Sequence, residues 1–191
     1  MMVTEEIYPD GDVIFVSKLH PDAEEYRFRC SLTFLRNASP VFTTMFSGRY
    51  VEGQGLSAEH PKEVHLEEDD PKALRTMLKL LHLRIIGLPV VMKTKALAKL
   101  TVVVDKYDCL DAVNLTMRNL YLWHRDGCNS LSDCNQLAFI AYTLKMPVEF
   151  RRMTRALVCE HNEPFAEVMP ADEIDTGLSF KALSKYLRTS F

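Results

Sequence analysis

Most strand-type patterning in this 191-residue chain lies before residue 66 and most helix-type patterning lies after it, and that order limits the folds open to the chain. Up to about residue 66, short apolar runs and alternating apolar and charged residues are typical of strands. Beyond that point apolar residues recur every three or four positions, as on one face of a helix. Strands followed by helices predict an α+β fold, and not the alternation of a doubly wound sheet.

The strand signals lie in three short segments. Residues 12–16 (DVIFV) form a continuous apolar run, and in residues 26–30 (YRFRC) apolar side chains alternate with arginines. A polar turn at residues 17–25 would join these two strands into a β-hairpin. Val64 and Leu66 alternate with charged residues and predict a short third strand.

Two helix starts carry the same local signal. Ser39-Pro40 and Asp70-Pro71 each offer a capping side chain followed by a proline at the first helical position. The acidic residues 67–70 also complement the N-terminus of the second helix. Between these helices, residues 48–62 hold three glycines and few apolar groups and predict an exposed loop. Apolar spacing predicts further helices over residues 97–110, 111–124, 132–145, 147–158 and 178–187.

Charge and cysteine content restrict the classes of partner. The net charge is -3 and no basic run occurs, so we expect no direct contact with nucleic acid. The acidic first twelve residues do not resemble a secretory signal, and no apolar stretch approaches the roughly 20 residues that cross a bilayer. The five cysteines are odd in number and scattered among apolar residues, as expected of reduced, buried thiols. We therefore expect an intracellular protein of the cytoplasm or nucleus that does not contact membranes.

A metal site would have to draw on five residues of the C-terminal third. These are His124, Cys128, Cys134, Cys159 and His161. Structural zinc sites usually pair their ligands two to four residues apart on tight turns, whereas Cys134 and Cys159 lie on the apolar side of predicted helices. A catalytic cysteine acting with His65 or His82 would lack a third, orienting group. We expect no metal.

Two further motifs suggest chemistry but have simpler explanations. Gly53-Gln54-Gly55 lacks the preceding strand, the third glycine and the lysine of a phosphate-binding loop. The carboxylates of residues 67–70 complement a helix N-terminus more often than they form a catalytic pair. We therefore expect no catalytic residue, no cofactor and a non-enzymatic protein.

Three stretches of the chain, taken in order, resemble the BTB/POZ family. They are Gly11-Asp12-Val13-Ile14-Phe15-Val16, the segment from Phe28-Arg29-Cys30-Ser31 through Leu35 to Ser39-Pro40-Val41-Phe42-Thr43-Thr44-Met45-Phe46, and Val64-His65-Leu66-Glu67-Glu68-Asp69-Asp70-Pro71. With Val104-Asp105-Lys106-Tyr107-Asp108-Cys109, the match is most similar to the fungal branch and covers roughly residues 11–122.

The resemblance implies a short β-sheet with a cluster of helices, used as a protein-interaction adaptor or scaffold. The implied organisation is an N-terminal segment at residues 1–11, a BTB/POZ domain at 12–124, a helical extension at 125–161, and a tail at 162–191 with a possible last helix. A boundary near Gly127-Cys128-Asn129 would separate the body from the extension.

The resemblance also bears on oligomeric state. Dimeric regulators of this family place a basic residue beside the aspartate matching Asp12, but this chain has Leu32 at that position, and Ser31 where a histidine is common. Such dimers exchange an N-terminal strand and helix, whereas only eleven residues precede Asp12. A swapped dimer is therefore disfavoured, and other homo-oligomers remain open.

Adaptors that bind a cullin scaffold often carry a hydrophobic-x-Glu pattern just after the helix ending in Met-Phe. Tyr50, Val51 and Glu52 stand in that place, so the resemblance implies a protein-binding site that recruits a cullin-type ubiquitin ligase complex. An exposed aromatic beside a carboxylate offers one anchor and one rim charge to a partner. The alternative is a nuclear transcriptional co-regulator that acts through a DNA-binding partner.

Overall fold

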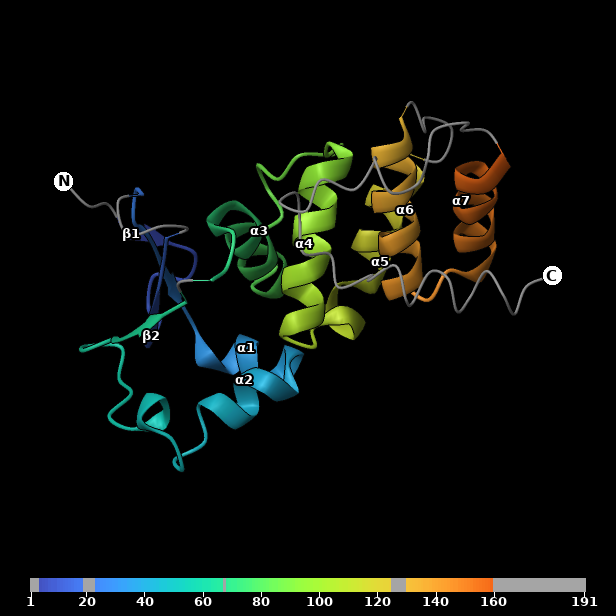
Figure 1. Cartoon of the computed structure of the whole chain (residues 1–191). Helices are drawn as coiled ribbons and strands as arrows, with labels where there is room; N and C mark the ends of the chain where they lie inside the picture. Colours follow the sequence, from blue (N-terminus) through green and yellow to red (C-terminus); the bar gives the residue numbers. More distant parts are fainter. Residues whose placement is uncertain (1–3, 19–22, 67, 125–129, 160–191) are drawn as a thin grey trace. The chain divides into compact units, whose positions relative to one another are not determined.

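A computed structural model describes residues 4–18, 23–66, 68–124 and 130–159 (Figure 1). These residues form a four-stranded sheet, a short 3-10 turn and seven α-helices, so the expected α+β class is confirmed. None of these helices is both long and apolar enough to cross a membrane. The predicted helix at 178–187, the tail from residue 162 and the boundary at 127–129 fall outside the described residues.

The described residues divide into two compact units. The first contains the residues up to 89 together with 103–114, and the second contains 90–102 and the residues from 115 onward. The first unit holds the whole sheet, and each unit is described separately below. The elements of the first unit are β1 (Thr4–Glu6), β2 (Val13–Ser17), β3 (Tyr26–Cys30), α1 (Leu32–Ala38), α2 (Pro40–Met45), η1 (Val51–Gly53), β4 (Lys62–His65) and α3 (Pro71–Leu81).

The sheet of the first unit has the strand order β1-β3-β2-β4. The antiparallel pairing of β2 with β3 sets Phe15 opposite Phe28 and confirms the predicted hairpin, while β4 pairs in parallel with β2 as the predicted third strand. Two details differ from the prediction. Ser17 belongs to β2 and not to the turn. In addition, β1 pairs in parallel with β3, and it was not predicted because a strand of three residues is too short to show a hydrophobic period.

Helix α2 begins where the sequence predicts it. The Ser39 hydroxyl accepts a hydrogen bond from the Phe42 amide at 3.0 Å, and Pro40 occupies the first turn. Helix α1 was not predicted, because Ser31 makes no side-chain cap. Its free amide at Leu32 is instead satisfied by the Asp12 carboxylate, 2.8 Å away and distant in sequence.

Aromatic side chains fill the core of the first unit. The ring of Phe42 stacks on Tyr107 at a centroid distance of 4.6 Å and also contacts Phe15 at 5.6 Å and Phe46 at 6.3 Å. All four side chains are almost completely buried. Burying rings of this size contributes most of the hydrophobic stabilisation of a small unit.

Four further helices follow α3 in the chain. They are α4 (Thr94–Lys106), α5 (Leu110–Leu122), α6 (Leu131–Thr143) and α7 (Pro147–Cys159). Their positions confirm the predicted periodicity to within a few residues. Helices α6 and α7 of the second unit pack against each other, and buried residues such as Leu137 and Ile140 of α6 form its core (Figure 1).

The expectation that all five cysteines are reduced thiols is wrong for Cys134. Cys134 is disulfide-bonded, whereas Cys30 and Cys109 are buried free thiols. Burial is the main cause that raises the pKa of both free thiols, to about 12 for Cys109, so neither is activated as a nucleophile. The helical periodicity that placed Cys134 on an apolar face could not reveal which cysteine approaches it in space.

A buried carboxylate ties the loop before α3 to the end of α4. Asp69 is 4% exposed and accepts hydrogen bonds from the Tyr107 hydroxyl at 2.5 Å and from the Lys106 ammonium at 2.8 Å. Its backbone carbonyl accepts a further bond from the Ser17 hydroxyl at 3.0 Å. Asp70 caps α3 as predicted, but the structural role of its neighbour Asp69 was not predicted.

We predict that Tyr107→Phe destabilises the first unit by about 1–3 kcal/mol, because a buried carboxylate loses a donor. Tyr26→Phe is the matched control, since the Tyr26 hydroxyl bonds to Glu24 at an exposed position and its loss should cost under about 0.5 kcal/mol. Urea denaturation followed by circular dichroism measures both. Equal losses of stability in the two variants would contradict the role given to Asp69.

Candidate functional site

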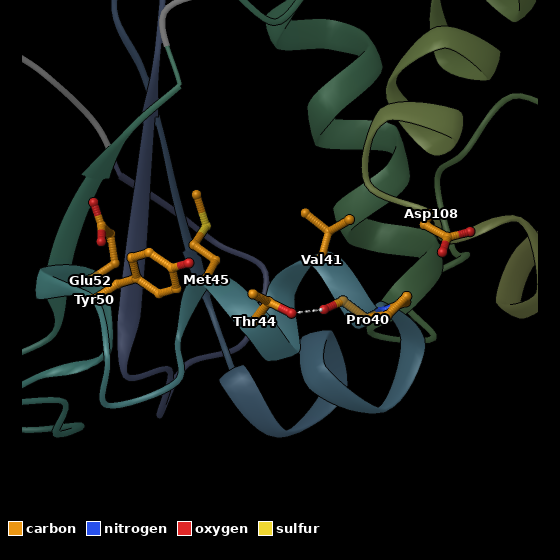
Figure 2. A pocket seen from close by; sticks show the side chains of 7 residues that line it. All are labelled: Pro40, Val41, Thr44, Met45, Tyr50, Glu52 and Asp108. Atoms are coloured by element: carbon orange, nitrogen blue, oxygen red, sulfur yellow. Dashed lines mark hydrogen bonds between the residues drawn. The ribbon is translucent and has the colours of Figure 1, made fainter.

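Helix α2 carries side chains to two different surroundings. Phe42 and Phe46 face the core, whereas Pro40, Val41, Thr44 and Met45 line an open groove on the opposite side (Figure 2). The apolar spacing behind Ser39-Pro40 would place Val41 and Met45 on one helix face with these two phenylalanines. The structure leaves both only half-buried, because residues one position apart on a helix point about 100° away from each other.

The loop after α2 supplies the second wall of the groove. Tyr50 and Glu52 line it, and the Tyr50 side chain is 50% exposed. Val51 is 71% exposed but does not line the groove. The structure therefore brings together two of the three residues proposed from sequence, and places the middle one outside.

Backbone hydrogen bonds hold this loop in shape. The Tyr50 amide donates to the Ser47 carbonyl, and the Gly53 amide donates to the Tyr50 carbonyl, both at 3.1 Å. The Lys62 ammonium donates to the carbonyls of Val51 and Gln54. A loop tied in this way presents its side chains with less ordering to be lost on binding.

Asp108 lines the other end of the groove and was not proposed as a site residue. It lies just after α4 with φ 48°, a left-handed conformation that aspartate adopts more readily than most residues. The groove thus has an apolar middle and a carboxylate at either end, with Glu52 beside Tyr50 and Asp108 beyond Pro40 (Figure 2). Its volume is about 560 Å³. The helix predicted over residues 97–110 includes Asp108, so no local sequence signal marked it as a site residue.

The described groove residues do not form a pair of groups suited to covalent catalysis. Thr44 is the only one with an aliphatic hydroxyl, and that hydroxyl donates to the Pro40 carbonyl at 2.9 Å. No histidine, lysine or cysteine stands among them to act as its base. The arrangement can bind an apolar surface and opposite charge, which is the chemistry of recognition.

Of the five candidate metal ligands, only His124 and Cys134 have described side chains. His124 is half-buried and Cys134 is committed to a disulfide, while Cys128, His161 and the Cys159 side chain are not described. Within the described part of the chain, no three His, Cys, Asp or Glu side chains gather in a way that could hold a metal ion.

The two histidines weighed for catalysis occupy different environments. His65 is exposed at the end of β4, whereas His82 is 3% exposed at the end of α3. The His82 Nε2 atom accepts a bond from the Ser31 amide at 3.0 Å, and Nδ1 lies 2.8 Å from the Leu78 carbonyl. These contacts fit a neutral ring protonated on Nδ1, and burial lowers the pKa of His82. His82 is a structural histidine.

A second polar cluster lies in the helical unit. The Arg152 guanidinium is 3.1 Å from the Glu149 carboxylate, and both influence the buried hydroxyl of Tyr121. Burial raises the pKa of Tyr121 to about 12, so this hydroxyl keeps its proton at neutral pH. We interpret the cluster as polar packing between helices.

We predict that Gly53→Ala disturbs the loop that carries Tyr50 and Glu52. A Cβ atom at Gly53 would lie 2.2 Å from the Ser47 carbonyl oxygen, so the backbone must move, at a cost of about 1–3 kcal/mol. At Gly48 a Cβ atom meets nothing within 4 Å, so Gly48→Ala is the control. Tryptic cleavage after Arg49 should accelerate in the first variant alone; equal cleavage rates would contradict this account.

We predict that stability falls as the pH drops below about 6.5, where the unfolded chain protonates its histidines. The folded protein holds the pKa of His82 below that value, so its contribution is complete above pH 6.5 and is lost toward the lower, folded pKa. His82→Gln should flatten the pH dependence of the unfolding free energy. His60→Gln, at an exposed site, should leave it unchanged. A slope retained in His82→Gln would show that other groups cause it.

No protein-family model matches the chain, and no curated protein matches it at a significant level. The functional assignment therefore depends on the geometry of the groove and on the resemblance seen in the sequence.

Proposed function

We propose that this chain is a non-enzymatic BTB/POZ-type interaction module that binds another protein through the α2 groove. The proposed domain covers residues 12–124, followed by a helical extension at 125–161. The order of the β2–β3 hairpin, the capped helix α2, the parallel strand β4 and the capped helix α3 agrees with that family resemblance. Fold resemblance alone does not specify a function, so the proposal depends on the groove.

The observation that carries the proposal is that Tyr50 and Glu52 line the same groove as α2. Tyr50 offers a large amphipathic ring that is half exposed, and such side chains dominate the binding energy of many interfaces. Met45, on the groove side of α2, has a flexible thioether chain that adapts to a partner's surface. Glu52 adds a rim charge that favours a basic partner surface and speeds its association.

We further propose that the partner is a cullin-type scaffold, so that the chain acts as an adaptor for ubiquitin ligation. The support is the hydrophobic-x-Glu pattern of Tyr50 and Glu52, together with the position of the intervening Val51 outside the groove. That placement agrees with a pattern that specifies only its first and third residues.

An adaptor of this kind would act inside the cell, and the redox states of the cysteines indicate the compartment in which the protein folds. The buried free thiols of Cys30 and Cys109 agree with a reducing compartment. The disulfide at Cys134 does not, because disulfides persist mainly in oxidising compartments. Peptide mapping of protein alkylated at the moment of cell lysis measures which form Cys134 takes in the cell.

We predict that the full chain binds a purified cullin N-terminal domain and that the double variant Tyr50→Ala/Glu52→Ala weakens binding by more than about tenfold. Truncating an interface anchor and a rim charge removes both contributions proposed above. Val51→Ala is the matched control, because this residue is on the same loop and exposed but outside the groove. Isothermal titration calorimetry measures the affinities. Absent binding, or equal affinity in the double variant, would refute the cullin assignment.

A further inference from the structure

The 83–88 loop, which follows α3 in the first unit, is mostly apolar. Leu83, Ile85 and Ile86 in this loop are all exposed, and Ile86 is 94% exposed, the highest value among the large apolar residues that the structure describes. Apolar side chains of this size stabilise a structure when they leave water, so three of them exposed on one short loop give up that gain. Contiguous exposed apolar groups of this kind mark a surface that another molecule covers.

Backbone hydrogen bonds give this loop a defined shape. The Arg84 amide donates to the Lys79 carbonyl at 2.8 Å, which closes the end of α3. The Leu88 amide donates to the Ile85 carbonyl at 3.1 Å, across a tight turn that contains Ile86. The exposed isoleucines are therefore held in place before any contact is made, which lowers the ordering cost of binding.

Leu83 has a backbone conformation that leucine does not favour. Its φ is 57°, in the left-handed region where the end of a helix usually has glycine or asparagine. The side chain gains little packing in return, because Leu83 is 76% exposed. A strained apolar residue that is not buried in its own chain indicates a side chain used in contact with another molecule.

The uncompensated charge of this loop is positive. No Asp or Glu occurs in residues 71–104. Two carboxylates line the hollow beside the loop, and both already have cationic partners: Arg75 and Lys79 for Glu5, and Arg29 for Glu6. Arg84 lines the same hollow and is exposed, and no described carboxylate lies within ion-pair distance of its guanidinium. The loop therefore offers apolar side chains next to an unpaired cation.

The α2 groove has the complementary surface. Val41 and Met45 line its apolar middle, Glu52 and Asp108 line it with carboxylates, and no Lys, Arg or His stands among the described lining residues (Figure 2). Its volume of about 560 Å³ is larger than two isoleucine side chains fill. Groove and loop thus match in apolar character and are opposite in charge.

We propose that the 83–88 loop of one copy of this chain docks into the α2 groove of a second copy. Ile85 and Ile86 pack on the apolar middle of the groove, and Arg84 pairs with one of its carboxylates. The occupant is a second copy, because this chain carries both complementary surfaces, leaves both exposed, and has no residue that lines both. The contact joins two different surfaces, so repeated copies form open chains or a closed ring.

This inference goes beyond the cullin proposal and does not depend on it. A partner protein that binds the α2 groove would compete with the loop of the second copy for the same surface. The concentration of the chain would therefore set the fraction of grooves that are open to such a partner.

Sedimentation velocity of the full chain tests the proposal over about 5–500 µM, the range in which small interfaces associate. We expect the average mass to rise with concentration above the mass of one chain. Ile86→Asp puts a carboxylate on the loop, and Thr44→Arg fills the groove, so each should weaken self-association by at least about tenfold. Val51→Asp and Thr33→Arg are the matched controls, because they introduce the same side chains at exposed positions outside both surfaces.

Mixing the two interface variants shows whether loop and groove bind each other. The Ile86→Asp chain retains an intact groove, and the Thr44→Arg chain retains an intact loop. An equimolar mixture should therefore form a complex of two chains and nothing larger, although each variant alone stays monomeric at the same concentration.

A third variant separates docking from folding. Leu83→Gly places glycine at a φ of 57°, which glycine adopts without strain, so the free energy of unfolding in urea should not fall. The same variant removes an exposed side chain of the loop, so self-association should weaken by at least about threefold.

Several outcomes would overturn the inference. They are a monomer at every concentration, self-association that persists in Ile86→Asp or Thr44→Arg, and a mixture of these variants that forms no two-chain complex. A monomer that sediments with anionic lipid vesicles and loses this binding in Ile86→Asp would also overturn it, because the loop would then have a lipid surface as its partner. The experiment contains no second protein, so its failure leaves the cullin proposal standing, and a cullin domain that does not bind leaves this inference standing.

Discussion

The buried carboxylate of Asp69 is the contact on which the first unit most depends. It joins the loop before α3 to the end of α4 through Lys106 and Tyr107, and the backbone carbonyl of the same residue accepts a hydrogen bond from Ser17 of strand β2. Burial, with the hydrogen bond to Asp69 as the next cause, raises the pKa of Tyr107, so its hydroxyl remains a donor at any physiological pH. A carboxylate removed from water is tolerated only where donors of this kind satisfy it.

Tyr107 extends this constraint to the groove. Its ring stacks on Phe42, and its backbone carbonyl accepts a bond of 2.6 Å from the Ser39 hydroxyl that caps α2. The position and the tilt of α2 are thus both determined from its buried side. The groove lies on the other side of the same six-residue helix, so the positions of Val41 and Met45 depend on core residues that would not contact a partner.

Sequence alone predicted the elements whose signals are local. The hairpin, the caps at Ser39 and Asp70, and the helices from α3 to α7 follow from period and capping chemistry within a few residues. It missed α1, because the group that satisfies the Leu32 amide is Asp12, twenty residues away. It also missed the role of Asp69, the groove side of α2 and the disulfide at Cys134, each of which depends on a partner brought near only by folding.

For the same reason, the site was recovered only in part. Tyr50 and Glu52 belong to one short loop, so a linear motif could point to them together.

Asp108 lies at the other end of the groove, beyond α2, and no linear pattern connects its segment with that loop. Its position depends on the turn after Tyr107, in which the Asp108 amide donates to the Asp105 carbonyl and the Cys109 amide donates to the Val104 carbonyl, both at 3.0 Å. Tyr107 therefore serves two purposes, since the residue that closes the core through Asp69 also places the next side chain at the end of the groove. A change that loosened the Asp69 contact would be expected to reach the groove at Asp108 before it reached Tyr50, whose loop is held by its own backbone hydrogen bonds.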